Sequence, residues 1–232
     1  MWTNFFPRIW VTITENWRTL LDGLQTTLII TGVAFVGGLI VGTIIAVLRT
    51  NPSRHPVARA ARAVSSFYVG LMRGIPDVVL LLLLFFVFLA PFVTADNAIW
   101  VACLGTGMIA SSYLSEIVRA AILSIGSEQM EASRDLGTTR FGAMRRVILP
   151  QGFKRAVPQL GNHLIIIAKG TSVVGFIAVM DLTRSVQNIV ARTFDAIVPY
   201  ILLAGIYIVY VYFLALLIKF FEVKVFKTKR AI

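Results

Sequence analysis

Long apolar runs constrain the fold of this chain more than any other feature of its sequence. Five stretches are long and apolar enough to cross a bilayer as helices: residues 24–48, 74–94, 98–124, 157–180 and 197–218. Only 14% of the 232 residues are charged, against roughly a quarter in an ordinary soluble domain. Because lipid offers the backbone no hydrogen-bond partner, the spans are expected to be helical. We therefore predict an all-α protein of the lipid bilayer, with a single transmembrane domain over residues 1–232.

The positive charge of the chain is distributed unevenly between the loops. A net charge of +11 is compatible with nucleic-acid binding, but sixteen of the 22 Lys and Arg residues fall in three segments: residues 49–73, residues 125–156 and the tail from Lys219. Four more lie on the other side of the spans: Arg8, Arg18, Arg184 and Arg192. The positive-inside rule then predicts an external amino end and a cytoplasmic carboxyl end. The basic residues are explained by topology, and no nucleic-acid partner is expected.

The cysteine, the two histidines and the paired glycines do not indicate catalysis or metal binding. The single cysteine, Cys103, lies in an apolar run and is expected to be a small core residue. His55 and His163 lack the spacing of metal ligands, so no metal site is expected. Gly38 and Gly42 form a GxxxG pattern, which favours ordinary close packing of helices over a specific dimer contact.

The segment 125–156 is too polar to span a membrane and too regular to be a simple linker. A short helix over residues 128–136 is expected to end at Gly137 in a left-handed conformation. A second short helix follows over residues 140–149 and is expected to stop at Pro150. Two short helices joined by a glycine elbow would form a rigid projection.

Side chains of this segment are expected to face solvent. Thr138 or Thr139 is a suitable N-cap for the second helix, and Glu131, Arg134 and Asp135 would be exposed on the first. The physical pattern alone leaves two interpretations open. The segment is either a rigid projection that transmits force or an amphipathic loop that lies on the lipid headgroups.

The motif "EASRDLGTTRFGAMRRVILP" at residues 131–150 resembles the EAA loop of the membrane subunits of ABC importers. That pattern reads Glu-Ala-Ala, three residues, Gly, nine residues, then Ile-x-Leu-Pro. Five residues match it in register: Glu131, Ala132, Gly137, Leu149 and Pro150. Two positions depart mildly, with Ser133 in place of Ala and Val147 in place of Ile.

Flanking stretches narrow the resemblance to the polar amino-acid uptake branch, with its MetI-like permease fold of five transmembrane helices. The stretches are "MRGIP" at 72–76, "YLSEIVRAAI" at 113–122, "LPQGFKRAVPQLGN" at 149–162 and "KGTSVV" at 169–174. The resemblance runs from about Leu24 to the carboxyl end. Gly170 stands where that branch usually has Asp, and Asp77 with Leu80 replaces the more frequent Leu and Gln.

The resemblance implies that this chain is a permease subunit in a bacterial inner membrane. Residues 125–156 would be a cytoplasmic coupling loop that docks on a separate ATPase, through Glu131, Ala132, Arg134, Asp135, Gly137 and Arg140. The implied partners are two ATP-binding subunits, a second permease copy or paralogue, and an extracytoplasmic substrate-binding protein. ATP and Mg would be bound by the partner ATPase. This chain is expected to hold no cofactor and to be no enzyme, since it lacks GxxxxGK[ST].

Polar residues inside the spans are candidates for a substrate path because charges in lipid are costly. Glu116 and Arg119 are three residues apart and are expected to pair, either as a structural ion pair or in the path. Lys169 lies twelve residues past Val157, about 18 Å along a helix. The break expected at Gly170 adds hydroxyl groups, so the candidate path comprises Glu116, Arg119, Lys169, Thr171, Ser172 and Asp77.

Two questions about these residues stay open from the sequence. A structural contact of Lys169 with Asp77 or Glu116 is as compatible with the sequence as a path residue. Asp77, which follows "RGIP", is acidic, and it weakly favours basic amino acids as the substrates among polar amino acids.

Three other classes of protein compete with an ATP-driven importer. An ion-coupled secondary transporter would explain Glu116 and Lys169 but would leave the segment 125–156 without a use. An intramembrane enzyme is disfavoured because the spans contain no HExxH, no GxSxG and no paired catalytic aspartates. An exporter or channel would not need an importer-type coupling loop.

Overall fold

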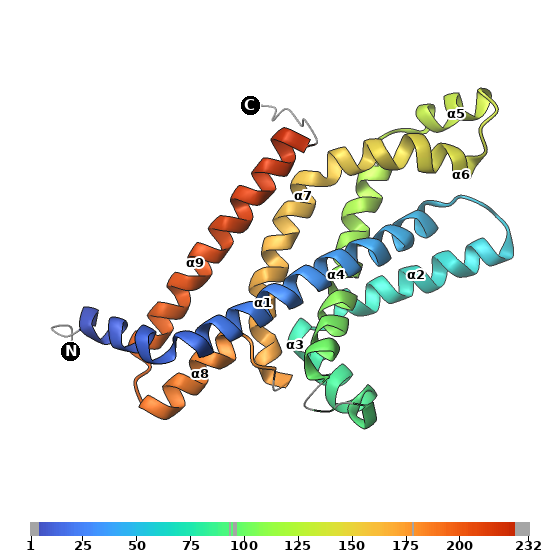
Figure 1. Cartoon of the computed structure of the whole chain (residues 1–232). Helices are drawn as coiled ribbons and strands as arrows, with labels where there is room; N and C mark the ends of the chain where they lie inside the picture. Colours follow the sequence, from blue (N-terminus) through green and yellow to red (C-terminus); the bar gives the residue numbers. More distant parts are fainter. Residues whose placement is uncertain (1–4, 93, 95–96, 178, 226–232) are drawn as a thin grey trace. The chain divides into compact units, whose positions relative to one another are not determined.

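Every regular element of the structure is helical among the residues that it describes. The structure is a computed structural model and describes residues 5–92, 94, 97–177 and 179–225. The α-helices, shown in Figure 1, are α1 (Phe5–Thr50), α2 (Pro56–Gly74), α3 (Asp77–Leu83), α4 (Ala98–Leu123), α5 (Ser127–Asp135), α6 (Arg140–Ala143), α7 (Leu149–Gly170), α8 (Leu182–Thr193) and α9 (Ile197–Phe220). Short 3₁₀ or π segments extend them: η1 (Leu84–Phe88), η2 (Ala90–Phe92), η3 (Met144–Ile148), η4 (Thr171–Ile177) and η5 (Phe221–Val225).

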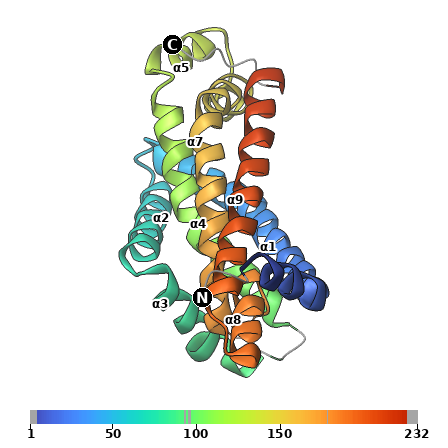
Figure 2. The same cartoon turned by 90° about the vertical axis from the view of Figure 1, so that its left-hand side faces the viewer.

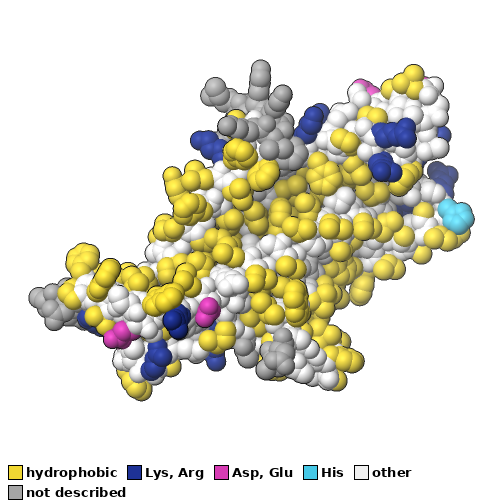
Figure 3. Space-filling model, in the orientation of Figure 1, with side chains coloured by type: hydrophobic (Ala, Val, Ile, Leu, Met, Phe, Trp, Pro, Cys, Tyr) yellow, Lys and Arg dark blue, Asp and Glu magenta, His cyan; other side chains and the backbone are white. Residues whose placement is uncertain are grey.

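Four helical runs of the described chain are long and apolar enough to cross a membrane, and a fifth is possible. The four are α1, α4, residues 140–177 and residues 197–223, and α2 with α3 and η1 would make the fifth if they form one crossing. Hydrophobic side chains cover much of the helix surface visible in Figure 3, as contact with lipid requires. The all-helical prediction is therefore confirmed.

The first helix is much longer than the predicted span. It begins at Phe5, whereas the apolar run alone predicts a start near residue 24. Its 46 residues extend over about 69 Å at 1.5 Å per residue, more than twice the thickness of the hydrocarbon layer. Only a part of α1 therefore lies within lipid.

The second predicted span, residues 74–94, starts close to its predicted beginning at Pro76 and consists of the short segments α3, η1 and η2. The chain is helical on both sides of Ile75 and Pro76, with α2 ending at Gly74 and α3 starting at Asp77. Ile75 is extended, at φ −107° and ψ 136°. A residue that precedes proline avoids the helical region because the proline ring clashes with its backbone, which explains the position of the break.

The predicted stop at Pro150 is wrong. The chain continues as a helix from α6 through the π segment η3 into α7, and Pro150 is the second residue of α7. Inside a continuous α-helix the proline ring would clash with the carbonyl group four residues earlier. The π segment directly before it changes the hydrogen-bonding register and so makes room for the proline ring.

The chain divides into two compact units, each built from three separate stretches. The first unit contains residues 1–34, 76–107 and 165–215. The second unit contains residues 35–75, 108–164 and 216–232. The helices α1, α4, α7 and α9 thus contribute to both units.

The core of the first unit forms where α1, α8 and α9 pack together. Leu20 of α1 contacts Leu182, Val186 and Ile189 of α8, and the α9 side chains that pack against this cluster include Ile206. Figure 2 shows α8 beside the first part of α1. Packing of these side chains holds α8 on α1.

The helix α8 was missed by the sequence prediction, which treats this stretch as a loop. Its N-cap is the buried Asp181, whose carboxylate accepts hydrogen bonds from the backbone N–H groups of Thr183 (3.1 Å) and Arg184 (2.9 Å). Burial raises the pKa of Asp181, and these backbone hydrogen bonds oppose that shift. The N–H of Leu182 donates to Thr27 Oγ1 of α1 at 3.1 Å. An Asp before an apolar residue is a helix-start signal that identifies α8 in retrospect.

Two polar contacts tie the start of α1 to the end of α8. Arg8 forms an ion pair with Asp195, and Arg192 donates to the side-chain oxygen of Asn16. Burial alone would raise the pKa of Asp195, but the hydrogen bond and the charge of Arg8 hold it below its ordinary value. The first turns of α1 are therefore part of the first unit.

The second unit depends on a close approach of α1 and α4. A Cβ atom at Gly42 would lie 2.8 Å from the carbonyl oxygen of Ser111 and 2.9 Å from the backbone nitrogen of Ser115. Tyr68 of α2 adds a hydrogen bond from its hydroxyl to the carbonyl of Met108 at 3.0 Å. Gly42 thus packs within the chain, as ordinary close packing predicts.

Replacing Gly42 by Val is expected to destabilise the protein by about 1–3 kcal/mol, because the added side chain forces α1 and α4 apart. The measurement is the midpoint of thermal unfolding of the purified chain in detergent. Gly37→Val, on the same helix, is the matched control. A Cβ atom at Gly37 would have no atom of a neighbouring element within 4 Å. Equal losses of stability in the two variants would contradict the prediction.

Candidate functional site

The predicted coupling loop, residues 125–156, is called the coupling segment below, and it contains the predicted glycine elbow. The helix α5 ends at Asp135, and Gly137 adopts a left-handed conformation with φ +80°. The N–H of Gly137 donates to the carbonyl of Arg134 at 2.9 Å, and the N–H of Thr138 donates to that of Ser133 at 3.3 Å. These bonds satisfy carbonyl groups at the end of α5 and fix the direction of the chain after it.

The second short helix begins at a threonine cap, as predicted. Thr139 is the N-cap of α6, and its hydroxyl accepts a hydrogen bond from the N–H of Gly142 at 3.1 Å. Thr138, the alternative cap, instead bonds the hydroxyl of Ser133 at 2.8 Å and also donates to the Ser133 carbonyl. The two threonines therefore hold both sides of the elbow.

The exposed surface of the segment includes all of the predicted coupling residues. Those residues are Glu131, Ala132, Arg134, Asp135, Gly137 and Arg140. Two apolar side chains beside the elbow, which sequence reasoning missed, are even more conspicuous: Leu136 is 86% exposed and Phe141 is 73% exposed. Figure 1 shows α5 and α6 as a helical pair, and Figure 3 shows Lys and Arg side chains around it. The segment thus offers charged and apolar groups together.

A guanidinium group fastens the segment to the end of α4. Arg155 of α7 donates to the carbonyl oxygen of Ser124 and lies 3.3 Å from its hydroxyl oxygen. A Cβ at Gly152, one turn earlier on α7, would lie 3.7 Å from the backbone of Ala121. The chain that leaves α4 through α5 and α6 is therefore closed onto α4 by α7. This contact fixes one end of the segment on α4, and the choice between a projection and a loop on the lipid headgroups stays a prediction.

The predicted ion pair of α4 is present and has a third member. Arg119 bonds one carboxylate oxygen of Glu116, at 2.9 Å from Nε and 2.8 Å from its terminal nitrogen. Arg49 of α1 bonds the other oxygen and also donates to the hydroxyl of Ser66 on α2 at 3.2 Å. Sequence spacing gives only the pair on one helix, because Arg49 is distant along the chain. Both oxygens of Glu116 are thus neutralised, and its predicted role in a substrate path stays a prediction.

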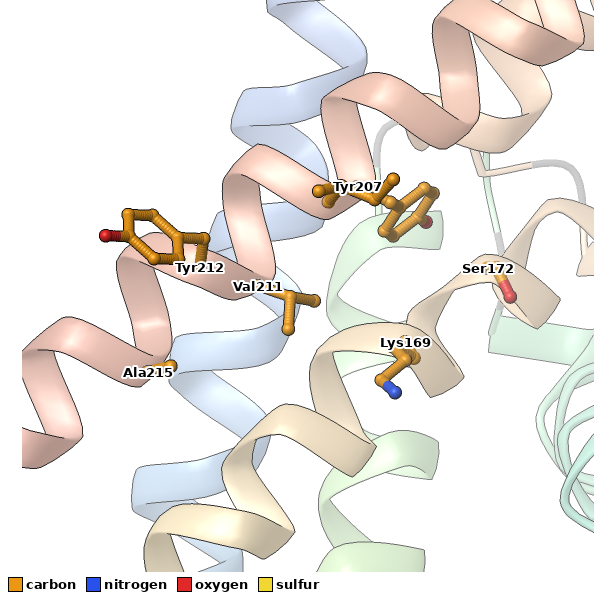
Figure 4. A pocket seen from close by; sticks show the side chains of 7 residues that line it. Lys169, Ser172, Tyr207, Val211, Tyr212 and Ala215 are labelled. Atoms are coloured by element: carbon orange, nitrogen blue, oxygen red, sulfur yellow. The ribbon is translucent and has the colours of Figure 1, made fainter.

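Lys169 lies at the end of α7, where the helix tightens into η4 after Gly170. This break is the one predicted at Gly170. Lys169 is exposed and lines a cavity of about 640 Å³ together with Ser172 and, from α9, Tyr207 and Tyr212, as Figure 4 shows. Thr171 is buried, and its hydroxyl donates to the carbonyl of Ala168 at 2.8 Å.

The remaining candidate, Asp77, is an exposed residue in the first turn of α3. It belongs to the first unit with Lys169, Thr171 and Ser172, whereas Glu116 and Arg119 belong to the second. None of the ion pairs between described residues includes Lys169 or Asp77. The structural contact of Lys169 with Asp77 is therefore not formed.

The other polar candidates are structural. Cys103 is buried in α4, as predicted for a core residue. His163 packs its ring on that of Tyr113, with the ring centres 5.3 Å apart. Within the described residues, no group of three or more His, Cys, Asp or Glu side chains is placed to bind a metal ion.

The apolar helical crossings and the rigid, exposed segment between them define a membrane transport subunit. The chain belongs to the family described as "Binding-protein-dependent transport system inner membrane component", whose model matches residues 38–227. It is a multi-pass protein of the bacterial inner membrane.

Curated relatives align over most of their length. The L-cystine transport system permease protein TcyB of Bacillus subtilis is 38% identical over 204 residues, which cover 86% of this chain and 83% of the relative. The glutamate/aspartate import permease protein GltK of Escherichia coli O157:H7 is 36% identical over 212 residues, covering 88% and 90%.

Solved structures confirm the MetI-like ABC permease fold. A crystal structure of an amino acid ABC transporter with histidines superposes with a TM-score of 0.79 at 32% identity, covering 91% of this chain and 96% of that one. An inward-facing MetNI methionine ABC transporter gives a TM-score of 0.72 at 23% identity, covering 90% and 95%. The second likeness shows the fold alone.

Replacing Arg155 by Ala is expected to loosen the coupling segment, because the variant loses the bonds to Ser124. Amide hydrogen exchange over residues 125–143 should accelerate about tenfold, the change that follows from losing roughly 1–1.5 kcal/mol of local hydrogen bonding. The neighbouring exposed cation offers the control: Lys154→Ala should leave exchange unchanged. Equal exchange in the wild type and in Arg155→Ala would show that the bond does not hold the segment.

Replacing Glu116 by Gln is expected to lower stability by about 1–3 kcal/mol, because Arg49 and Arg119 then lose their shared anion. A double-mutant cycle with Arg49→Gln, followed by thermal unfolding in detergent, measures the coupling between the two side chains. Glu128→Gln, a change at an exposed carboxylate in the first turn of α5, should have a much smaller effect. Additive losses in the cycle would contradict the paired arrangement.

Proposed function

We propose that this chain is the membrane-spanning permease subunit of an ATP-driven importer that moves polar amino acids. The observation that carries the proposal is the elbow at Gly137, exposed between α5 and α6 and closed onto α4 by Arg155. Family membership supplies the class of machine. The elbow is the part of the chain on which the ATP-binding subunit acts.

In the proposed topology the chain crosses the membrane five times, with the amino end outside and the carboxyl end in the cytoplasm. The fifth crossing requires α2, α3 and η1 to act together as one broken span. The orientation follows from the basic residues, which concentrate in residues 49–73, 125–156 and the tail. It places the coupling segment in the cytoplasm, where ATP is available.

The proposed assembly contains two such permeases, identical or related, with two ATP-binding subunits and an extracytoplasmic substrate-binding protein. The ATP-binding subunits hold ATP and Mg, and this chain performs no hydrolysis. Leu136 and Phe141 would enter an apolar groove of the ATPase, and Glu131, Arg134 and Arg140 would make charged contacts at its rim. Ala132 and Asp135 complete the docking face.

Rigidity of the segment is what makes this contact useful. When the ATPase subunits close, the displacement of their groove must turn membrane helices as rigid bodies and not bend a loop. The hydrogen bonds at Gly137 and Thr139 fix the elbow, and Arg155 transmits its movement to α4. Through this contact between Arg155 and α4, ATP binding and hydrolysis would switch the permease between inward-facing and outward-facing states.

The proposed substrate path contains the polar residues of the spans. Lys169 and Ser172 line an open cavity, and the hydroxyl of Thr171 completes the broken helix beside them. Asp77, Glu116 and Arg119 are the further candidates. The relatives are named for L-cystine and for glutamate and aspartate, which supports a polar amino acid as the substrate.

An ion-coupled secondary amino-acid transporter is the competing function. It would use the charges of Glu116 and Lys169 without any ATPase. The exposed apolar side chains at the elbow disfavour it, because Leu136 and Phe141 then face water without a partner.

The deciding experiment is uptake into proteoliposomes by the purified chain, with and without its ATPase and binding protein. The importer predicts that amino-acid uptake requires both partners and ATP. Uptake by the chain alone, driven by an ion gradient, would establish the secondary transporter instead.

Gly137→Val tests the elbow itself, because a β-branched residue at φ +80° is strained by about 1–3 kcal/mol. Uptake per ATP hydrolysed should fall about tenfold as the docking conformation becomes less populated. Gly137→Asn is the control, since Asn tolerates left-handed backbone. If an assembled Gly137→Val complex takes up as much amino acid per ATP hydrolysed as the wild type, the proposed role of the elbow is wrong.

A further inference from the structure

Two cavities of the first unit meet at Ser172. The larger one, of about 640 Å³, is lined by Lys169 and the α9 residues Tyr207 and Tyr212. The smaller one, of about 230 Å³, is lined by η4 and by Arg184 and Gln187 of α8. Ser172 lines both, so the cavities are neighbours on either side of one residue of η4.

Each cavity contains one cation and no described acidic lining residue. Lys169 lies in the larger cavity and Arg184 in the smaller one. None of the ion pairs between described residues includes either side chain. This differs from the second unit, where Arg49 and Arg119 share the carboxylate of Glu116. Lys169 belongs to a candidate crossing, where a cation is costly without a counter-charge. Arg184 is exposed on α8, outside the candidate crossings, and its side chain is likewise open to an anionic group from outside the chain.

A hydrogen bond to Asp181 fixes the backbone of Arg184. Its N–H group bonds the buried carboxylate of Asp181 at 2.9 Å, which holds it in the first turn of α8. Gly175 allows η4 to approach closely, because a Cβ there would lie 3.3 Å from Arg184 Cβ and from Asp181 Oδ1. The carboxylate of Asp181 accepts backbone hydrogen bonds, and Arg184 lines the smaller cavity together with Gln187.

We infer that the two cavities form a paired site for an amino acid that carries two carboxylate groups. Arg184 binds one carboxylate with the two parallel hydrogen bonds that a guanidinium favours, and Lys169 binds the other as a point charge. Ser172, between them, and Gln187 provide polar partners for the ammonium group. The inference rests on the proposed function and narrows its substrate class. It also reverses the weak preference for basic amino acids suggested by Asp77.

The test is equilibrium binding of radiolabelled L-glutamate to the detergent-purified permease–ATPase complex without the binding protein, so that only the membrane site selects. L-glutamine, which has a single carboxylate, and L-arginine serve as competitors. Glutamate should bind about tenfold more tightly than glutamine, the value of one additional charge-assisted contact. Arginine should not compete. Arginine binding as tight as that of glutamate would overturn the inference, and so would the absence of any glutamate binding.

Two variants assign the contacts. Arg184→Gln and Lys169→Met should each reduce the glutamate-to-glutamine affinity ratio about tenfold, and Arg184→Lys should restore part of it. Arg18→Gln removes an exposed arginine of the same unit that lines neither cavity, and it should change nothing. Elution volume and unfolding temperature identify any variant that fails to fold.

The outcomes separate this inference from the proposed function. If the complex couples ATP to amino-acid uptake but the affinity ratio is the same in Arg184→Gln and in the wild type, the paired site is wrong and the importer stands. If ATP-coupled uptake is absent, the proposed function itself fails.

Discussion

The inability of lipid to hydrogen-bond the backbone governs the whole structure. Every described crossing is a helix, and the breaks occur only where a specific residue requires or permits them. Pro76 forces one break through its effect on Ile75. The other follows Gly170, where the hydroxyl of Thr171 bonds the carbonyl of Ala168 as α7 tightens into η4. The second break adds the hydroxyl groups of Thr171 and Ser172 to the candidate path beside Lys169.

Close packing and ion pairs then complete each compact unit in a different way. In the second unit, Gly42 lets α1 contact the backbone of α4, and Glu116 holds two arginines from those helices. In the first unit, an apolar cluster fixes α8, while the side chains of Lys169 and Arg184 form no ion pair with a described residue. The contrast separates charges that stabilise the fold from charges that are available to a substrate.

The coupling segment was the most predictable part because its structure is local. Gly137 and Thr139 determine the elbow through hydrogen bonds to residues only a few positions away. The prediction failed at Pro150, because the π segment η3 changes the helical register just before the proline. No single residue type in the sequence predicts such a π segment. Arg155 was missed for a different reason. Its partner, Ser124, is 31 positions away along the chain.

By itself, the sequence determined the class of protein, the helical nature of the spans, the elbow and the pair of Glu116 with Arg119. The class of protein came from the resemblance of residues 131–150 to the EAA loop. The other features depend on composition, periodicity or spacing within a turn or two of helix. Only the tertiary structure showed that Arg49 joins that pair, that α8 packs on the start of α1, and that Ser172 separates two cavities. The physical reason is the same for all three. Their partners are distant in the chain, and only packing of the helices brings them together.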